Sequence, residues 1–170
     1  MRHQAETLVL DLDELRLTNL LMITLLGANI HLAAQNLIPN PGIENVVTCP
    51  TIASNIYDSQ QWFTHYGSPD IFHSCGSGLQ DVPTNNTGYQ PTYGGNGYAG
   101  FFAHPSPEFI QCQLLDTLEA GATYEATFYV NLINKSQYSV DYIGMHFSAI
   151  DSFLTPWTGA HEFVPHIMCD

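Results

Sequence analysis

A glycine-rich segment, residues 83–102, carries the residue types with which proteins bind sugars. Within it, Tyr89 and Tyr93 lie beside Gln90 and Asn96. A pyranose ring stacks on an aromatic side chain, and amide groups form hydrogen bonds with its hydroxyls. We therefore predict that Tyr89, Gln90, Tyr93 and Asn96 bind the ligand. Four further aromatic side chains offer a stacking face or, alternatively, pack in the core: Trp62, Tyr66, Tyr98 and Trp157.

Acidic residues far outnumber basic ones, which bears on the partners of the chain. The sequence has 16 Asp and Glu against 3 Lys and Arg, a net charge of −13. This charge excludes nucleic acid as an expected partner. Since few basic residues are present to pair the carboxylates, calcium is an expected counterion, because it prefers carboxylate and carbonyl oxygens. A solvated acidic surface that aids solubility is the alternative.

Asp141 is the carboxylate whose place in the sequence most indicates a special environment. In the expected strand 140–148, alternation places Asp141 on the same face as Ile143, Met145 and Phe147. A carboxylate at the rim of a core face must be hydrogen-bonded or bound to a cation, because burying it unpaired costs several kcal/mol. Two interpretations follow: Asp141 accepts backbone N–H groups of a nearby turn, or it is a metal ligand.

Four cysteines allow three complete disulfide pairings in an exported chain. Cys49 and Cys75 flank a loop-rich stretch that a disulfide would stabilise, so we favour this pair. Cys112 lies in an expected strand, residues 109–114, where a buried free thiol is as reasonable as a bridge. Cys169 is next to the last residue.

The sequence offers little support for catalysis. Residues 161–166 resemble a zinc-protease helix motif, but the two histidines are one residue too far apart and Pro165 would break the helix. The Gly-x-Ser-x-Gly motif of serine hydrolases is absent from the sequence. Three carboxylates are candidates for a glycosidase acid and base: Asp70, Glu108 and Glu162. No perturbed, mutually oriented pair is evident from the sequence, so we predict a non-catalytic protein.

The expected elements are strands. Gly, Pro, Asn and Ser recur at short intervals after residue 35, and no stretch keeps a helical apolar period long enough for a core helix. The clearest strand is 123–132, in which apolar and polar residues alternate and Tyr129 and Asn131 fall on the polar face. The pattern predicts an all-β fold.

The first 34 residues are typical of an export signal. An apolar stretch from Leu17 to Ala34 follows Arg16 and ends in small residues. It is interrupted by Asn19 and His31, so it is a poor membrane-spanning helix. We expect a signal peptide at 1–34 and one domain at 35–170, secreted or on the outer cell surface, with no transmembrane span.

Several short motifs in the domain occur in a fixed order: residues 36–44, Cys49-Pro50, Trp62, residues 67–75, residues 97–100 and residues 138–144. Together they resemble the galactose-binding-like jelly-roll domain found at the front of secreted or cell-surface proteins of Bacteroidetes, some of which continue into an OmpA-like domain. The resemblance covers the whole of 35–170 and implies a jelly-roll β-sandwich. Relatives continue beyond the region of 164–167, so it also implies that the last strands lie outside this sequence.

The resemblance further implies a structural calcium ion. The opening turn of such domains supplies backbone carbonyls and a Glu, which Glu44 matches. A second carboxylate usually comes from a closing strand that this sequence lacks before Asp170, so Asp141 is the expected replacement.

The combined expectation is a non-catalytic binding module for a glycan or cell-envelope polysaccharide, with a structural calcium ion. A structural or adhesive module of a cell-envelope protein, which binds another protein, is one alternative. A fragment of a secreted hydrolase is the other.

Overall fold

The computed structural model describes residues 8–9, 35–103, 107–141, 143–149 and 165–169. The expected signal peptide lies outside the described residues except for Leu8 and Val9. No helix in these described ranges is long and apolar enough to cross a membrane.

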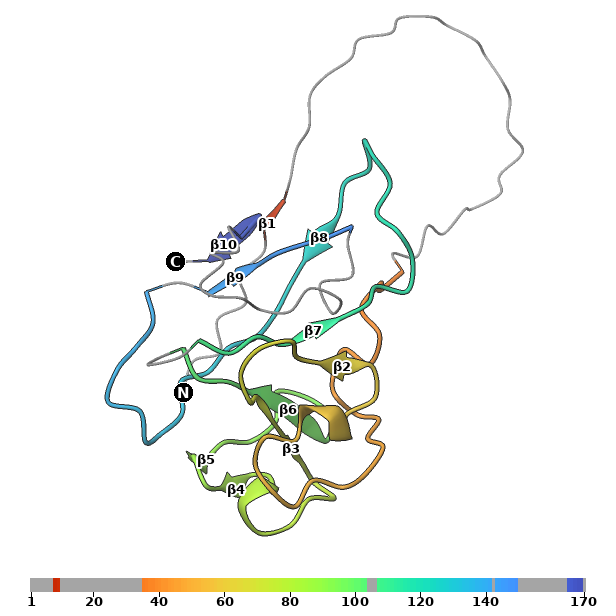
Figure 1. Ribbon diagram of the computed structural model, residues 1–170. Coiled ribbons are helices and arrows are strands. Elements are labelled where there is room, and N and C mark those ends of the chain that lie inside the picture. Colours follow the sequence, from red (N-terminus) through yellow and green to blue (C-terminus); the bar gives the residue numbers. More distant parts are fainter. Residues whose placement is uncertain (1–7, 10–34, 104–106, 142, 150–164, 170) are drawn as a thin grey trace, which may run out of the picture.

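Short antiparallel strands make up the architecture (Figure 1). Each sheet in the described part of the chain has two strands, with the pairs β1–β8, β2–β7, β3–β6, β4–β5 and β9–β10. The strands are β1 Leu8–Val9, β2 Trp62–Phe63, β3 Asp70–His73, β4 Thr84–Asn85, β5 Gly88–Tyr89, β6 Gly97–Gly100, β7 Gln111–Cys112, β8 Glu125–Ala126, β9 Ile143–Met145 and β10 Ile167–Cys169. Among the described residues the helical pieces are two 3-10 turns, η1 Ile56–Asp58 and η2 Gly78–Gln80. The all-β prediction is confirmed at this level, and the jelly-roll arrangement stays a prediction.

The β3–β6 pair is the most buried ladder. All four residues of β3 are buried, and it pairs with β6 in a register that sets Asp70 opposite Gly100 and His73 opposite Gly97. Glycine is required at Gly97, because a Cβ there would lie 2.8 Å from the carbonyl oxygen of Ile43. The two strands therefore approach the rest of the core closely.

The core cluster consists of three isoleucines from separate segments: Ile43, Ile56 and Ile71. Partly buried side chains pack against it: Val46, Trp62, Ala99 and Ile110. Burying one such side chain contributes about 1.5–3 kcal/mol relative to leaving it exposed. This cluster joins the 40–46 turn to η1 and to the β3–β6 pair.

Asn40 closes the 40–45 turn through its buried side-chain amide. Its Nδ2 donates to the carbonyl oxygens of Asn45 and Gln60, both at 2.9 Å, and to Ser59 Oγ at 3.2 Å. Its Oδ1 accepts from the backbone N–H of Asn45 at 3.0 Å, and its carbonyl oxygen accepts from Trp62 Nε1 at 2.8 Å. One asparagine thus satisfies polar groups of its own turn and of a segment 19 to 22 residues further along the chain.

The disulfide prediction is confirmed, since Cys49 and Cys75 are bridged. It links the end of the opening turn to the segment that follows β3. Cys112, in β7, is a free thiol, and burial raises the pKa of this thiol to about 11. Cys112 therefore stays a neutral thiol at physiological pH, as the buried-thiol interpretation expected.

The region from 123 to 149 departs from the expected long strands. Tyr124, Ala126 and Phe128 are half-buried and alternate with exposed residues, so the predicted faces are correct, but only Glu125–Ala126 pairs as a strand. Beyond them Val130 and Leu132 are 56% and 52% exposed, although both were expected on the dry face. The apolar face of a strand becomes buried only when another sheet packs on it, and no sheet among the described residues packs on these two side chains.

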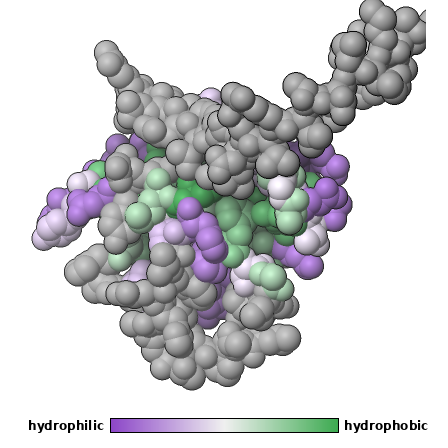
Figure 2. Space-filling view, turned by 90° about the horizontal axis from the view of Figure 1, so that it is seen from above, coloured by the Kyte–Doolittle hydropathy of each residue, from purple (hydrophilic) through white to green (hydrophobic). Residues whose placement is uncertain are grey.

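Figure 2 shows hydrophobic residues gathered in the middle of one face of the molecule, with hydrophilic residues on either side.

Candidate functional site

Two tyrosines form an exposed aromatic stack that joins the glycine-rich segment to the loop after β8. The ring centroids of Tyr93 and Tyr129 lie 3.6 Å apart with the ring planes 18° from parallel. Tyr93 is 58% exposed and Tyr129 45%. A hydrogen bond between the two hydroxyls, followed by desolvation, raises the pKa of Tyr93. Exposed aromatic rings are the groups on which sugar rings stack.

Amide groups surround this stack and hold the two loops together. The Gln90 and Asn131 side chains are hydrogen-bonded to each other. Asn134 Oδ1 accepts from the backbone N–H of Tyr89 at 2.8 Å. Tyr89 is 56% exposed and directly precedes Gln90 in the chain, so it is a third exposed aromatic residue of this segment. We call Tyr89, Gln90, Tyr93, Tyr129 and Asn131 the tyrosine surface.

Lys135 adds a further tie between the same two loops. Its Nζ donates to the carbonyl oxygen of Asn86 at 2.6 Å. The side chain of Asn134 also lies against Gly88, where an added Cβ would come within 2.8 Å of it. Gly88 has a φ of 132°, which an L side chain rarely adopts. The loop after β8 therefore seats closely on β5, and this contact positions the tyrosine surface.

Asn96, the fourth predicted ligand residue, is engaged by Glu44 instead. The carboxylate of Glu44 accepts from the Asn96 backbone N–H at 3.0 Å and from Asn96 Nδ2 at 2.9 Å. Asn96 Oδ1 accepts from Ser74 Oγ at 3.4 Å. Gly95 makes room for this contact, since a Cβ there would lie 1.8 Å from Glu44 Oε1. Both ends of the Asn96 amide thus hold the glycine-rich loop in place.

Of the two predicted calcium ligands, Glu44 is hydrogen-bonded by Asn96 and Asp141 is exposed, and the calcium site stays a prediction. Both oxygens of Glu44 are taken by Asn96. Asp141 is exposed and lies before β9, whose Ile143 and Met145 are half-buried, so its place at the rim of that face stays a prediction. In the described ranges no group of three or more His, Cys, Asp or Glu side chains could hold a metal ion. The carbonyl oxygens of Asn45 and Gln60, which a cation in this turn would attract, are instead bound by the amide of Asn40.

The remaining aromatic candidates are occupied by packing. Trp62 packs against the core cluster, and Tyr98 stacks on Phe72 with ring centroids 5.1 Å apart. Tyr66 packs edge-on against Phe109. Trp157 lies outside the described residues.

Two of the three carboxylates considered for glycosidase chemistry lie close enough to interact. Burial raises the pKa of Asp70, a hydrogen bond from the Ser54 backbone N–H lowers it, and the charge of Glu108 raises it. Glu108 Oε1 accepts from the backbone N–H and the hydroxyl of Ser68, at 3.0 and 2.9 Å, and Oε2 accepts from the Phe102 N–H at 2.8 Å. Glu108 thereby holds two loops together. Glu162 and residues 161–164 lie outside the described residues.

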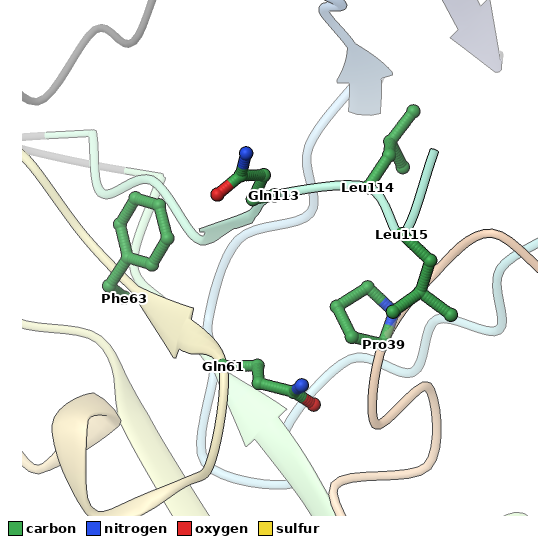
Figure 3. A pocket seen from close by; sticks show the side chains of 6 residues that line it. All are labelled: Pro39, Gln61, Phe63, Gln113, Leu114 and Leu115. Atoms are coloured by element: carbon green, nitrogen blue, oxygen red, sulfur yellow. The ribbon is translucent and has the colours of Figure 1, made fainter. Parts of the chain in front are cut away.

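A separate hollow of about 420 Å³ lies beside the β2–β7 ladder. Six side chains surround it in Figure 3: Pro39, Gln61, Phe63, Gln113, Leu114 and Leu115. None of these belongs to the tyrosine surface, and none was singled out in the sequence.

No family model, curated protein or solved structure matches this chain. The account of the site therefore rests on its geometry.

Tyr129, Asn131 and Asn134 were not predicted as site residues. A signal for two of them was present, because Tyr129 and Asn131 fall on the polar face of the expected 123–132 strand. An aromatic residue on a polar face is a candidate for ligand contact. Its stacking partner Tyr93 is 36 residues earlier, and no sequence pattern pairs the two.

Proposed function

We propose that this chain is a non-catalytic carbohydrate-binding module that holds a glycan on the tyrosine surface. The observation that supports this proposal is the exposed Tyr93–Tyr129 stack, together with the Gln90–Asn131 hydrogen bond that joins the same two loops. A sugar ring stacks on an aromatic face, and the hydroxyls at its edge need hydrogen-bond donors and acceptors. The open, loop-borne character of the surface favours an extended chain, such as a cell-envelope polysaccharide, over a single enclosed ring.

The wider proposal is a secreted or cell-surface module of the galactose-binding-like jelly-roll class. Its support is the all-β architecture, the order of the sequence motifs and the Cys49–Cys75 disulfide, a bond that persists in oxidising compartments. The net charge of −13 favours a neutral or cationic glycan over an anionic one. Calcium is not needed in this proposal, because Asn40 already closes the turn where the ion was expected.

A glycan array with single variants tests the sugar proposal. We expect Tyr93→Ala and Tyr129→Ala each to weaken binding about 5- to 10-fold, since sugar stacking on one ring is worth roughly 1–1.5 kcal/mol. Tyr138→Ala is the matched control, because Tyr138 is 79% exposed and lies outside the tyrosine surface. Absence of any reproducible sugar signal, or equal loss in all three variants, would overturn the proposal.

Protein adhesion is the second candidate function. Its specific support is the run of exposed apolar side chains near the tyrosine surface in sequence, which includes Val130, Leu132 and Val140 at 46–56% exposure. Such side chains are enriched in interface cores. In the array experiment, an empty glycan result together with self-association or protein capture that Leu132→Glu abolishes would favour adhesion.

A further inference from the structure

The hollow beside the β2–β7 ladder is built from two strands in register. Trp62 pairs with Cys112 and Phe63 with Gln111. Trp62 turns its side chain to the core cluster, so its neighbours Gln61 and Phe63 fall on the opposite face. Gln113 directly follows Cys112, the partner of Trp62, so its side chain falls on the same face as those of Gln61 and Phe63. The hollow is therefore the outer face of this ladder, bordered by Pro39, Leu114 and Leu115.

The backbone on both sides of the hollow is anchored. The Gln60 carbonyl oxygen accepts from Asn40 Nδ2 at 2.9 Å, and Trp62 Nε1 donates to the Asn40 carbonyl oxygen at 2.8 Å. Gln61 lies between these two anchors with a φ of 70°, a left-handed conformation that costs a non-glycine residue about 1 kcal/mol or more. Across the hollow, the Leu115 N–H donates to the Leu37 carbonyl oxygen at 2.9 Å. The walls are thus fixed before any ligand arrives.

The lining is apolar at its sides and carries two amides without partners. Gln61 and Gln113 are both exposed, and neither side-chain amide forms a hydrogen bond within the described part of the chain. In Figure 3 the two amides lie on opposite sides of the hollow, with the Phe63 ring on one flank and Pro39 and Leu115 on the other. None of the six lining residues carries a charge.

This chemistry selects for a neutral ligand with apolar faces and a polar edge. A charged ligand would lose hydration without gaining an opposite charge. A purely apolar ligand would strip water from two amides that have no other partner, at a cost of about 1–3 kcal/mol each. The volume of about 420 Å³ lies within the range of small-molecule sites, about 300–1,000 Å³.

We propose that this hollow is a second ligand site, which takes a single neutral pyranose unit between Phe63 and the Pro39–Leu115 wall. Gln61 and Gln113 hydrogen-bond hydroxyls at opposite edges of the ring. The inference goes beyond the tyrosine surface, since the two sites share no residue. One chain would then hold an extended glycan at one place and a terminal or branching sugar at the other.

Saturation-transfer NMR with three methyl glycosides, β-galactoside, β-glucoside and α-mannoside, tests this inference on the whole chain. We expect at least one to bind, and Gln113→Leu and Gln61→Leu each to weaken its binding about tenfold, the loss of one buried hydrogen bond. Gln137→Leu is the matched control, because Gln137 is an exposed glutamine that does not line the hollow. Thermal melts of the variants verify folding.

Tyr93→Ala separates the two sites. We expect it to leave methyl glycoside binding unchanged while it weakens binding to extended glycans about 5- to 10-fold. Absence of saturation transfer with all three glycosides would overturn the pocket inference, as would retention of binding in both glutamine variants. If Tyr93→Ala abolished methyl glycoside binding, the sugar would lie on the tyrosine surface. The pocket inference would then fail while the proposed function stood.

Discussion

Residues 40–100 and residues 122–149 use the same kinds of residues to different ends. In the first region, isoleucines from three segments are at most 6% exposed and the buried amide of Asn40 ties separate chain segments together. In the second region, apolar residues alternate correctly but Val130 and Leu132 remain about half exposed. The difference shows that stability comes from side-chain contacts between segments that are distant in the chain. Where such contacts are few, side chains that could bind a ligand stay exposed.

Truncation of one apolar side chain in each region is the strongest way to test this contrast. Ile71 is 0% exposed, so Ile71→Ala removes buried contacts and leaves a cavity, with an expected loss of about 3–4 kcal/mol in the free energy of unfolding. Phe128 is half-buried, and Phe128→Ala should cost about 1 kcal/mol. Urea denaturation of both variants measures the difference. Equal losses would show that the two regions contribute alike to the core.

Asn40 is expected to give the next largest effect. Asn40→Ala removes the donors to Asn45, Ser59 and Gln60 and leaves the Asn45 N–H without its acceptor, which should cost about 2–3 kcal/mol. Asn131→Ala, an exposed asparagine of the second region, is the matched control and should change stability by less than about 0.5 kcal/mol. If Asn40→Ala proved as mild as the control, Asn40 would not be the closing group of the turn.

The same contrast explains what the sequence could and could not predict. Local alternation correctly indicated which residues of 124–128 are half-buried and that Tyr129 is on the polar face. The Cys49–Cys75 pair was predictable because it flanks a loop-rich stretch. By contrast, the Asn40 contacts span up to 22 residues and the Tyr93–Tyr129 stack spans 36, and both depend on how loops meet in space. The strand expected at 140–148 pairs only at Ile143–Met145, so the alternation used for Asp141 starts before β9 does.

The pH dependence of stability should carry a smaller contribution from Asp70. Burial raises the pKa of Asp70 in the folded state above its ordinary value of 3.8, so the folded protein binds this proton more tightly than the unfolded chain. The contribution of Asp70 to stability therefore grows as the pH falls through the raised pKa and levels off below 3.8. Asp70→Asn keeps the acceptor for Ser54 and should remove this dependence, as measured by thermal melts between neutral and acidic pH. An unchanged pH profile in the variant would assign the dependence to other groups.

The tyrosine stack should affect stability less than either buried group, because it is exposed. Tyr129→Phe keeps the ring but removes the hydroxyl that hydrogen-bonds Tyr93, and it should cost less than about 0.5 kcal/mol. The raised pKa of Tyr93 should fall toward its ordinary value in the variant, and tyrosinate absorbance during an alkaline titration measures it. Sugar binding by stacking should survive, since the ring faces remain. A loss of binding equal to that of Tyr129→Ala would show that the hydroxyl, rather than the ring, contacts the ligand.

Calcium chelation should have the smallest effect of all. If calcium closed the turn through Glu44, a chelator would lower the melting temperature and Glu44→Ala would abolish that sensitivity. Since Asn40 binds the carbonyl oxygens of Asn45 and Gln60 and Asn96 takes both oxygens of Glu44, we expect an unchanged melting temperature with chelator. Asn40→Asp is the informative counterpart, because it replaces the donor by a carboxylate facing two carbonyl oxygens and a hydroxyl, a set of hard ligands that suits calcium. This variant should be destabilised and regain part of its stability with added calcium, whereas a chelator-sensitive wild type would show that the ion, and not the amide, closes the turn.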